Sequence, residues 1–179
     1  TGSAESDKGK NFWNDIKKTS EDRGCSILSQ TTGTGFQLFS NFRVCTDQAI
    51  TPQVLSKDKF IGLQFSLSLD KNQSTCIDKM VTNKWQKNNH TDENWNKGIE
   101  LAARYEKITF DAAHEQHTEF MEQMWNRFGV DIDGDDDTLQ GLRFSILSCY
   151  QTYHGENPRL NPLCKGLTGE VYFGWAFWD

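Results

Sequence analysis

The stretch GCSILSQTTGTGFQLFSNFRV, residues 24–44, decides the fold class of the first half of this chain of 179 residues. Apolar and polar residues roughly alternate on both sides of a Gly-rich turn at residues 32–35. This combination is typical of a β-hairpin, because alternation of period two places one face of each strand in a core. A second run, residues 61–69, alternates cleanly and predicts a strand with one solvated face. The sequence therefore predicts antiparallel β structure here, after an irregular lead-in at residues 1–22.

Helical spacing replaces strand alternation from about Asn88 onwards. Thr91 is followed by acidic residues, as at the N-cap of a helix. A second helix is predicted from Asp111 to an end at Gly129. Apolar residues recur at helical spacing at Trp95, Ile99, Ala102 and Ala103 in the first helix, and the stripe of the second helix consists of Ala113, His117, Phe120, Met121, Met124, Trp125 and Phe128.

Five aspartates between residues 131 and 137 precede a third predicted helix, from about Thr138 to Tyr153. An EF-hand loop that opened at Asp131 would need Gly at its sixth position and Glu at its twelfth, but Asp136 and Leu142 stand there. We therefore expect these carboxylates to stabilise the N-terminus of the helix. The apolar stripe is Leu139, Leu142, Ile146, Cys149, Tyr150 and Tyr153, and the residues off it, Phe144 and Leu147, predict a helix that is buried on more than one side.

Composition excludes several classes of partner. The net charge of −6 and a pI near 5.2 argue against nucleic acid or an anionic membrane surface. An aromatic content of 12% argues against disorder. Five cysteines without a Cys-x-x-Cys pair fit reduced thiols in a cytoplasmic protein. His114 and His117 are one residue short of metalloprotease spacing, so we expect surface or packing histidines and no metal site.

The last fifteen residues, KGLTGEVYFGWAFWD at 165–179, have the composition of a sugar-binding segment. Glycines allow close backbone approach, aromatic faces cover the apolar faces of pyranose rings, and a carboxylate accepts two hydroxyls. A buried aromatic strand is the alternative interpretation of this segment. Glu170 and Asp179 could flank a glycosidic bond, but a binding role for Asp179 needs fewer assumptions.

Residues 131–179 resemble a stretch of glycoside hydrolase family 65, which includes maltose, kojibiose, nigerose and trehalose phosphorylases and related α-glucosidases. The end of the chain matches most specifically, and residues 24–125 match more weakly, by order and pattern. The matching segments are Asp131-Ile-Asp133-Gly-Asp135, Gln140-Gly-Leu-Arg143-Phe144, Gln151-Thr-Tyr-His-Gly155, 165–174 and Phe177-Trp178-Asp179.

The resemblance implies an α+β fold: a partial antiparallel β-sandwich, then linker helices, then the first part of an (α/α)6 barrel. Residues 1–88 would be the end of the N-terminal β-sandwich domain, residues 89–129 the helical linker and residues 130–179 the start of the catalytic barrel. It also implies that Trp178 and Asp179 bind the non-reducing glucose of an α-linked disaccharide or oligosaccharide.

The implied reaction is inverting phosphorolysis to β-glucose 1-phosphate, or hydrolysis in related α-glucosidases, with inorganic phosphate as co-substrate and no other cofactor. The family's general acid is a glutamate downstream of Asp179, so we expect no catalytic residue here and an inactive fragment. The resemblance is also compatible with a homodimer of the full-length protein. The alternative function is a non-catalytic carbohydrate-binding or scaffold β-sandwich module.

Overall fold

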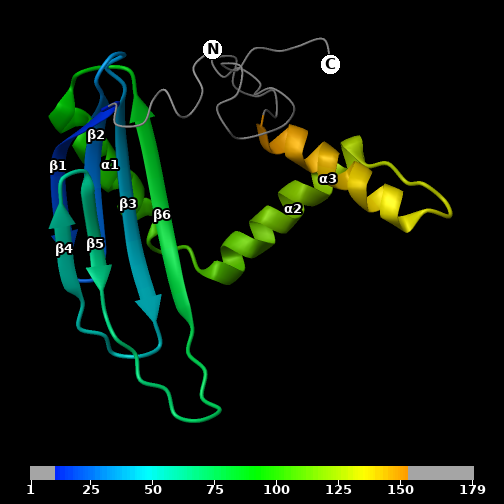
Figure 1. Ribbon diagram of the computed structural model, residues 1–179, viewed down its shortest axis with the longest axis horizontal. Helices are drawn as coiled ribbons and strands as arrows, with labels where there is room; N and C mark the ends of the chain where they lie inside the picture. Colours follow the sequence, from blue (N-terminus) through cyan, green and yellow to red (C-terminus); the bar gives the residue numbers. More distant parts are fainter. Residues whose placement is uncertain (1–10, 153–179) are drawn as a thin grey trace. The chain divides into compact units, whose positions relative to one another are not determined.

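The computed structural model describes residues 11–152, in which strands precede helices (Figure 1). The elements are β1 (Trp13–Glu21), β2 (Gly24–Thr31), β3 (Gln37–Thr46), β4 (Gln53–Lys57), β5 (Phe60–Gln64), β6 (Ile77–Gln86), α1 (Thr91–Tyr105), α2 (Phe110–Phe128) and α3 (Asp136–Thr152). Contacts divide the chain into two compact units, residues 1–110 and residues 111–179. The predicted α+β class, with antiparallel sheets, is confirmed. None of the helices in the described range has both the length and the apolar character to cross a lipid bilayer.

Four antiparallel strands in the order β1-β2-β3-β6 form the main sheet (Figure 1). The predicted hairpin at residues 24–44 is β2–β3, paired from Gly24 opposite Arg43 to Gln30 opposite Gln37. Its turn contains Gly35 at a φ of 71°, a conformation that side chains other than glycine rarely adopt. The Gly-rich turn therefore predicted the hairpin correctly.

The expectation of an irregular lead-in is wrong, because β1 occupies Trp13–Glu21. The register of β1 against β2 shifts between Asp15 and Lys17, which leaves Ile16 as an extra residue. Such a bulge breaks the period-two pattern on which strand recognition depends. The strand forms because its backbone pairs with β2, not because its side chains alternate.

A two-stranded hairpin, β4–β5, accompanies the main sheet. The predicted strand at residues 61–69 is correct only as far as Gln64, where the β4 ladder ends. Beyond that point Phe65 and Leu67 are half-buried while Ser66 and Ser68 are exposed, so the alternation of burial continues without a ladder partner among the described residues.

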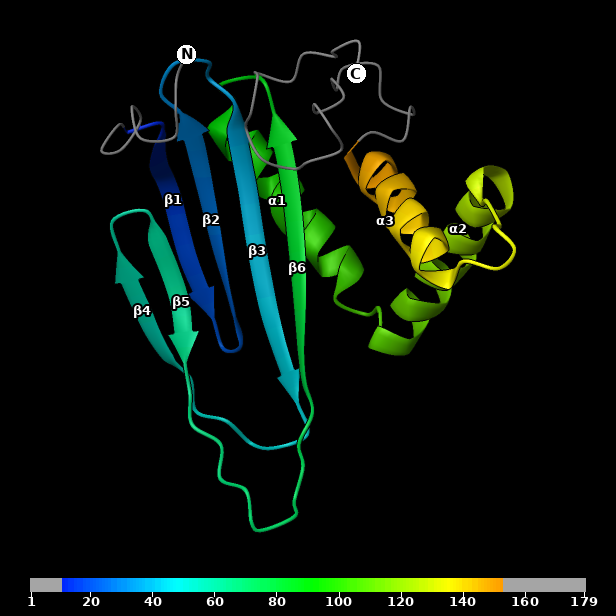
Figure 2. The ribbon, with the colours of Figure 1, turned by 45° about the vertical axis from the view of Figure 1, so that its right-hand side comes forward.

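Helix α1 packs against β3 and β6 and so covers one face of the main sheet (Figure 2). Leu28 of β2 and Phe39 of β3 are buried beneath Trp95, and Ile99 packs against this core. The rings of Phe39 and Trp95 meet edge to face, with centroids 5.4 Å apart. Gly98 lies where the backbone of α1 comes closest to Phe39, so this position has no room for a side chain.

A buried polar layer holds the N-terminal end of α1 on the sheet. The Gln37 amide nitrogen donates to the side-chain oxygens of Gln30 and Thr91, each at 3.1 Å. The Asn94 amide nitrogen donates to the side-chain oxygens of Gln37 and Asn88, each at 2.7 Å. Helix α1 begins at Thr91, whose hydroxyl accepts one of these hydrogen bonds. The sequence had predicted Thr91 as the N-cap, but His90 occupies that position. Because buried amides need partners, this layer fixes the position of the helix.

The second unit contains α3 and nearly all of α2, close to the predicted bounds, with Gly129 directly after the last residue of α2. Met124 is the buried residue of the predicted α2 stripe, and Tyr150 of α3 contacts the rings of Phe120 and Phe128. Phe144 is 69% exposed, contrary to the expectation that α3 is buried on more than one side. The reason is that, among the described residues of this unit, only α2 is available to cover α3.

Candidate functional site

The acidic loop before α3 caps the helix. The backbone N–H of Thr138 donates to one oxygen of Asp135 at 2.9 Å, and the Thr138 hydroxyl donates to the other at 2.8 Å. Asp135 precedes the first helical residue, Asp136, so its carboxylate occupies the N-cap. Arg143 pairs with Asp131 across the loop. The predicted placement of carboxylates at the helix N-terminus is confirmed for Asp135 at the cap and for Asp136 and Asp137 in the first turn.

The Asp135 carboxyl is expected to titrate below the ordinary aspartate pKa of about 3.9. Its pKa is lowered first by the bond from the Thr138 backbone N–H and then by the bond from the Thr138 hydroxyl. A lowered folded-state pKa means that the cap stabilises α3 above the unfolded pKa, and that this stability is lost as the pH falls through the folded value. An NMR titration of Asp135 would measure this. In Thr138→Val the pKa should rise, and a wild-type pKa at the ordinary value would contradict the expectation.

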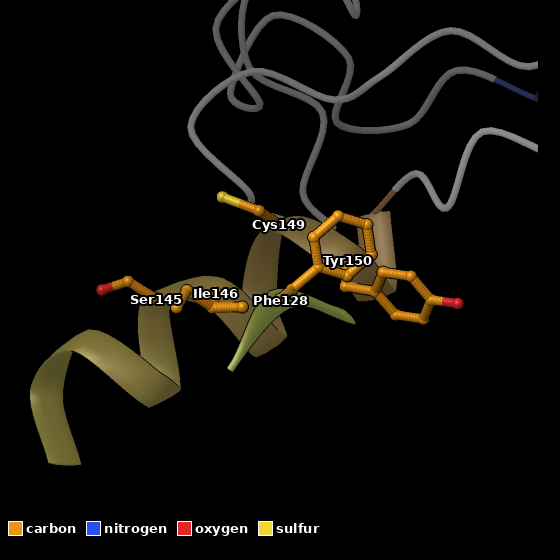
Figure 3. A pocket seen from close by; sticks show the side chains of 5 residues that line it. All are labelled: Phe128, Ser145, Ile146, Cys149 and Tyr150. Carbon is orange, nitrogen blue, oxygen red and sulfur yellow. The ribbon is translucent and has the colours of Figure 1, made fainter. Parts of the chain in front are cut away.

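A hollow of about 430 Å³ lies on the second unit, lined by Phe128, Ser145, Ile146, Cys149 and Tyr150. The rings of Phe128 and Tyr150 lie next to each other, with centroids 5.9 Å apart, while Ser145 and Cys149 project from α3 (Figure 3). The Ser145 hydroxyl donates to the Gly141 carbonyl of its own helix at 2.9 Å. These five lining residues include no carboxylate and no nucleophile with an adjacent base, so they offer an apolar contact surface and no evident chemistry.

The two histidines of α2 are exposed. Among residues 11–152, no cluster of three or more His, Cys, Asp or Glu side chains is arranged to hold a metal ion. Of the cysteines that the structure describes, Cys25 is buried, and burial raises its thiol pKa, whereas Cys45, Cys76 and Cys149 are exposed.

The residues expected to bind glucose, Trp178 and Asp179, lie outside the described residues, as does Glu170. The structure instead defines α3, the last described element before the 165–179 segment. It also reveals two structural features that the sequence patterns did not predict, the polar layer around Gln37 and the contact at Gly98. Polar residues at inward-facing positions of β3 could have indicated the polar layer. No local sequence pattern marks the contact at Gly98.

Comparison with known proteins gives a family match. The profile "Glycosyl hydrolase family 65, N-terminal domain" matches residues 2–124. Maltose phosphorylase of Bacillus subtilis is 37% identical over 83 residues, which are 46% of this chain and 11% of the relative. Kojibiose phosphorylase of Thermoanaerobacter brockii is 29% identical over 122 residues, which are 64% of this chain and 15% of the relative.

A solved structure agrees with these relatives. It is titled "Putative kojibiose phosphorylase from human microbiome" and superimposes with a TM-score of 0.81 at 28% identity, over 94% of this chain and 22% of that chain. The matched residues therefore correspond to less than a quarter of the solved chain, and to smaller shares of the two relatives above.

Proposed function

The chain belongs to glycosyl hydrolase family 65, and on this premise we propose that it is part of an inverting α-glucoside phosphorylase. The observation that carries this proposal is that the relatives named above are phosphorylases of α-linked glucose disaccharides, at up to 37% identity. An α-linked disaccharide and inorganic phosphate would be the substrates, and no further cofactor is needed. A phosphate-consuming reaction of this kind fits a cytoplasmic location.

We assign three segments within that enzyme. Residues 1–88 would be the end of the N-terminal β-sandwich, residues 89–129 a helical linker, and residues 130–179 the start of the (α/α)6 barrel. In support, the described strands all lie before Asn88, α1 and α2 lie within 89–129, and α3 begins at Asp136.

Trp178 and Asp179 would hold the non-reducing glucose, with the indole on the ring face and the carboxylate accepting hydroxyls. A phosphate oxygen would attack the anomeric carbon from the face opposite the leaving sugar. A glutamate downstream of Asp179 would protonate the glycosidic oxygen as that bond breaks, giving β-glucose 1-phosphate and the released sugar.

The test is an assay of the full-length protein that contains these residues, with maltose, kojibiose, nigerose and trehalose, with and without phosphate. We expect phosphate-dependent release of β-glucose 1-phosphate from at least one disaccharide, and no turnover by residues 1–179 alone. Phosphate-independent release of glucose would indicate an α-glucosidase. Turnover by the 179-residue chain would contradict the assignment of the general acid downstream of Asp179, and binding without turnover by the full-length protein would favour the carbohydrate-binding or scaffold alternative.

A further inference from the structure

Two exposed cysteines lie at the same end of the main sheet. Cys45 is the next-to-last residue of β3, and Cys76 directly precedes β6. In the β3–β6 ladder Cys45 is opposite Asp78, and directly opposite residues of an antiparallel pair point to the same face. The Cys76 thiol donates to the Asp78 carboxylate at 3.8 Å. Both cysteines are therefore neighbours of one carboxylate, on one face of the sheet.

The two strand ends are held together next to these cysteines. The Thr75 hydroxyl donates to the Asp47 carboxylate. The pKa of the Asp47 carboxyl is lowered, first by this bond and to a smaller extent by a bond from the backbone N–H of Cys76. Asp47 follows the last residue of β3 and Cys76 precedes the first residue of β6. These bonds therefore keep Cys76 close to β3.

Helix α1 does not cover this corner of the sheet. Arg43 lies two residues before Cys45, so it points to the same face, and its guanidinium pairs with Glu106 at 2.8 Å. Glu106 directly follows the last residue of α1. Cys45 therefore lies beyond the end of the helix, where the end of β3 and the start of β6 run side by side (Figure 2). Among residues 11–152 nothing buries either thiol, so a small reagent can reach both.

We propose that Cys45 and Cys76 form a reversible disulfide, a redox-sensitive bridge between β3 and β6, when the thiol–disulfide balance around the protein becomes oxidising. Diagonal neighbours on paired strands lie about 7–8 Å apart, and a disulfide usually joins Cα atoms about 4.4–6.8 Å apart. A movement of about 1 Å closes this difference. Cys76 can supply it because it lies outside the β6 ladder. An exposed bridge of this kind is readily reduced again.

The oxidant is a small disulfide such as oxidised glutathione. One protein thiolate attacks a sulfur of the oxidant, whose S–S bond breaks to give a mixed disulfide and one small thiolate. The second protein thiolate attacks the protein sulfur of the mixed disulfide and displaces the other small thiolate. The two protons of the protein thiols pass to the two departing thiolates, and the protein loses the two electrons that the oxidant gains. The bridge closes residues 45–76 into a loop that contains β4–β5, which stabilises this end of the sheet.

Peptide mapping tests the bridge without requiring activity, so its outcome is independent of the phosphorylase assignment. The full-length protein would be equilibrated with reduced and oxidised glutathione, alkylated and digested with trypsin. Peptides 44–57 and 72–79 each contain a single cysteine, and we expect them to be linked. In Cys45→Ser and Cys76→Ser the remaining thiol can form only the mixed disulfide. At about 0.1 mM reduced glutathione the wild type should favour the bridge over the mixed disulfide by about tenfold, because linked groups act at an effective concentration of about 1 mM.

A matched control moves one thiol to the other face. Ile77→Cys in the Cys76→Ser background stays in the peptide 72–79, but residue 77 is opposite Thr46 and points away from Cys45. This variant should not bridge to Cys45. Buried Cys25, in the peptide 24–43, should resist alkylation in every folded variant.

The wild-type protein decides the outcome even if a variant fails to fold. Mixed disulfides without linked peptides in the wild type would overturn the proposal. A link that forms between separate molecules, with a yield that rises with protein concentration, would also overturn it. Bridging by the Ile77→Cys variant as efficient as in the wild type would show that the register of β3 and β6 does not select the pair, which would equally contradict it.

Discussion

Gly98→Ala is expected to destabilise the first unit by about 2 kcal/mol or more, although alanine favours helices by about 1 kcal/mol over glycine. A β-carbon at position 98 would lie 2.5 Å from Cδ2 of Phe39 and closer still to Cγ. The ring cannot easily yield, because Phe39 is 1% exposed and packs in one cluster with Trp95 and with Leu28, which is completely buried. The steric cost should therefore exceed the gain in helix propensity. Urea or thermal unfolding followed by circular dichroism would measure the net effect.

Two glycines supply matched controls. Gly141 lies in α3 and Gly33 lies in the β2–β3 turn; a β-carbon at either would have no neighbouring atom within 4 Å, and neither has a positive φ. Gly141→Ala should be neutral or stabilising by up to about 1 kcal/mol, and Gly33→Ala should change stability by less than about 0.5 kcal/mol.

A double-mutant cycle identifies the clashing partner. If the Phe39 ring causes the strain, Gly98→Ala should cost less in a Phe39→Leu background than in the wild type, so the two effects will not add. Equal costs in the two backgrounds would show that Phe39 is not responsible. A stabilising Gly98→Ala would contradict the packing of α1 on β3.

Local patterns predicted the elements whose side chains repeat regularly. The β2–β3 hairpin follows from alternation around its Gly-rich turn, and α2 and α3 follow from helical spacing and from Gly129 and the acidic cap. These patterns depend only on residues close together in the chain, so they can be recognised without knowledge of the tertiary structure.

The remaining features depend on distant residues. Strand β1 was missed because its bulge near Ile16 breaks alternation. The Gln37–Asn94 hydrogen bond joins residues far apart in sequence, and Gly98 is explained only by a ring on another element. The resemblance to the family is most specific in residues 131–179, yet the profile that establishes the family matches residues 2–124, where the resemblance is weaker.

The sequence predicts which residue types form the sugar-binding site but not where these residues lie in space. Trp178 and Asp179 follow from a short, family-like block, and the structure describes no residue after Thr152. Their roles are therefore tested by function, in the full-length protein.

Asp179→Asn in the full-length protein is expected to lower kcat/KM for the disaccharide by about 10²–10³-fold, because hydrogen bonds to a charged group contribute about 1.5–3 kcal/mol each. Trp178→Ala should lower it by about 10–100-fold through loss of the apolar ring contact. Steady-state rates with phosphate saturating would measure both. Two matched controls should leave the rate nearly unchanged. Asp133→Asn replaces an exposed aspartate, and Trp13→Ala replaces a tryptophan that is 40% exposed.

The division of the loss between kcat and KM distinguishes a sugar-binding role from a structural one. Contacts to the glucose that is distorted towards an oxocarbenium-like transition state strengthen as the reaction proceeds, so their removal should lower kcat as well as raise KM. A purely structural defect would instead lower the thermal stability and the amount of active enzyme, leaving the KM of the surviving enzyme unchanged. If Asp179→Asn retained the wild-type kcat and KM, its carboxylate would not contact the reacting glucose, and the segment 165–179 would then be better explained as a buried aromatic strand.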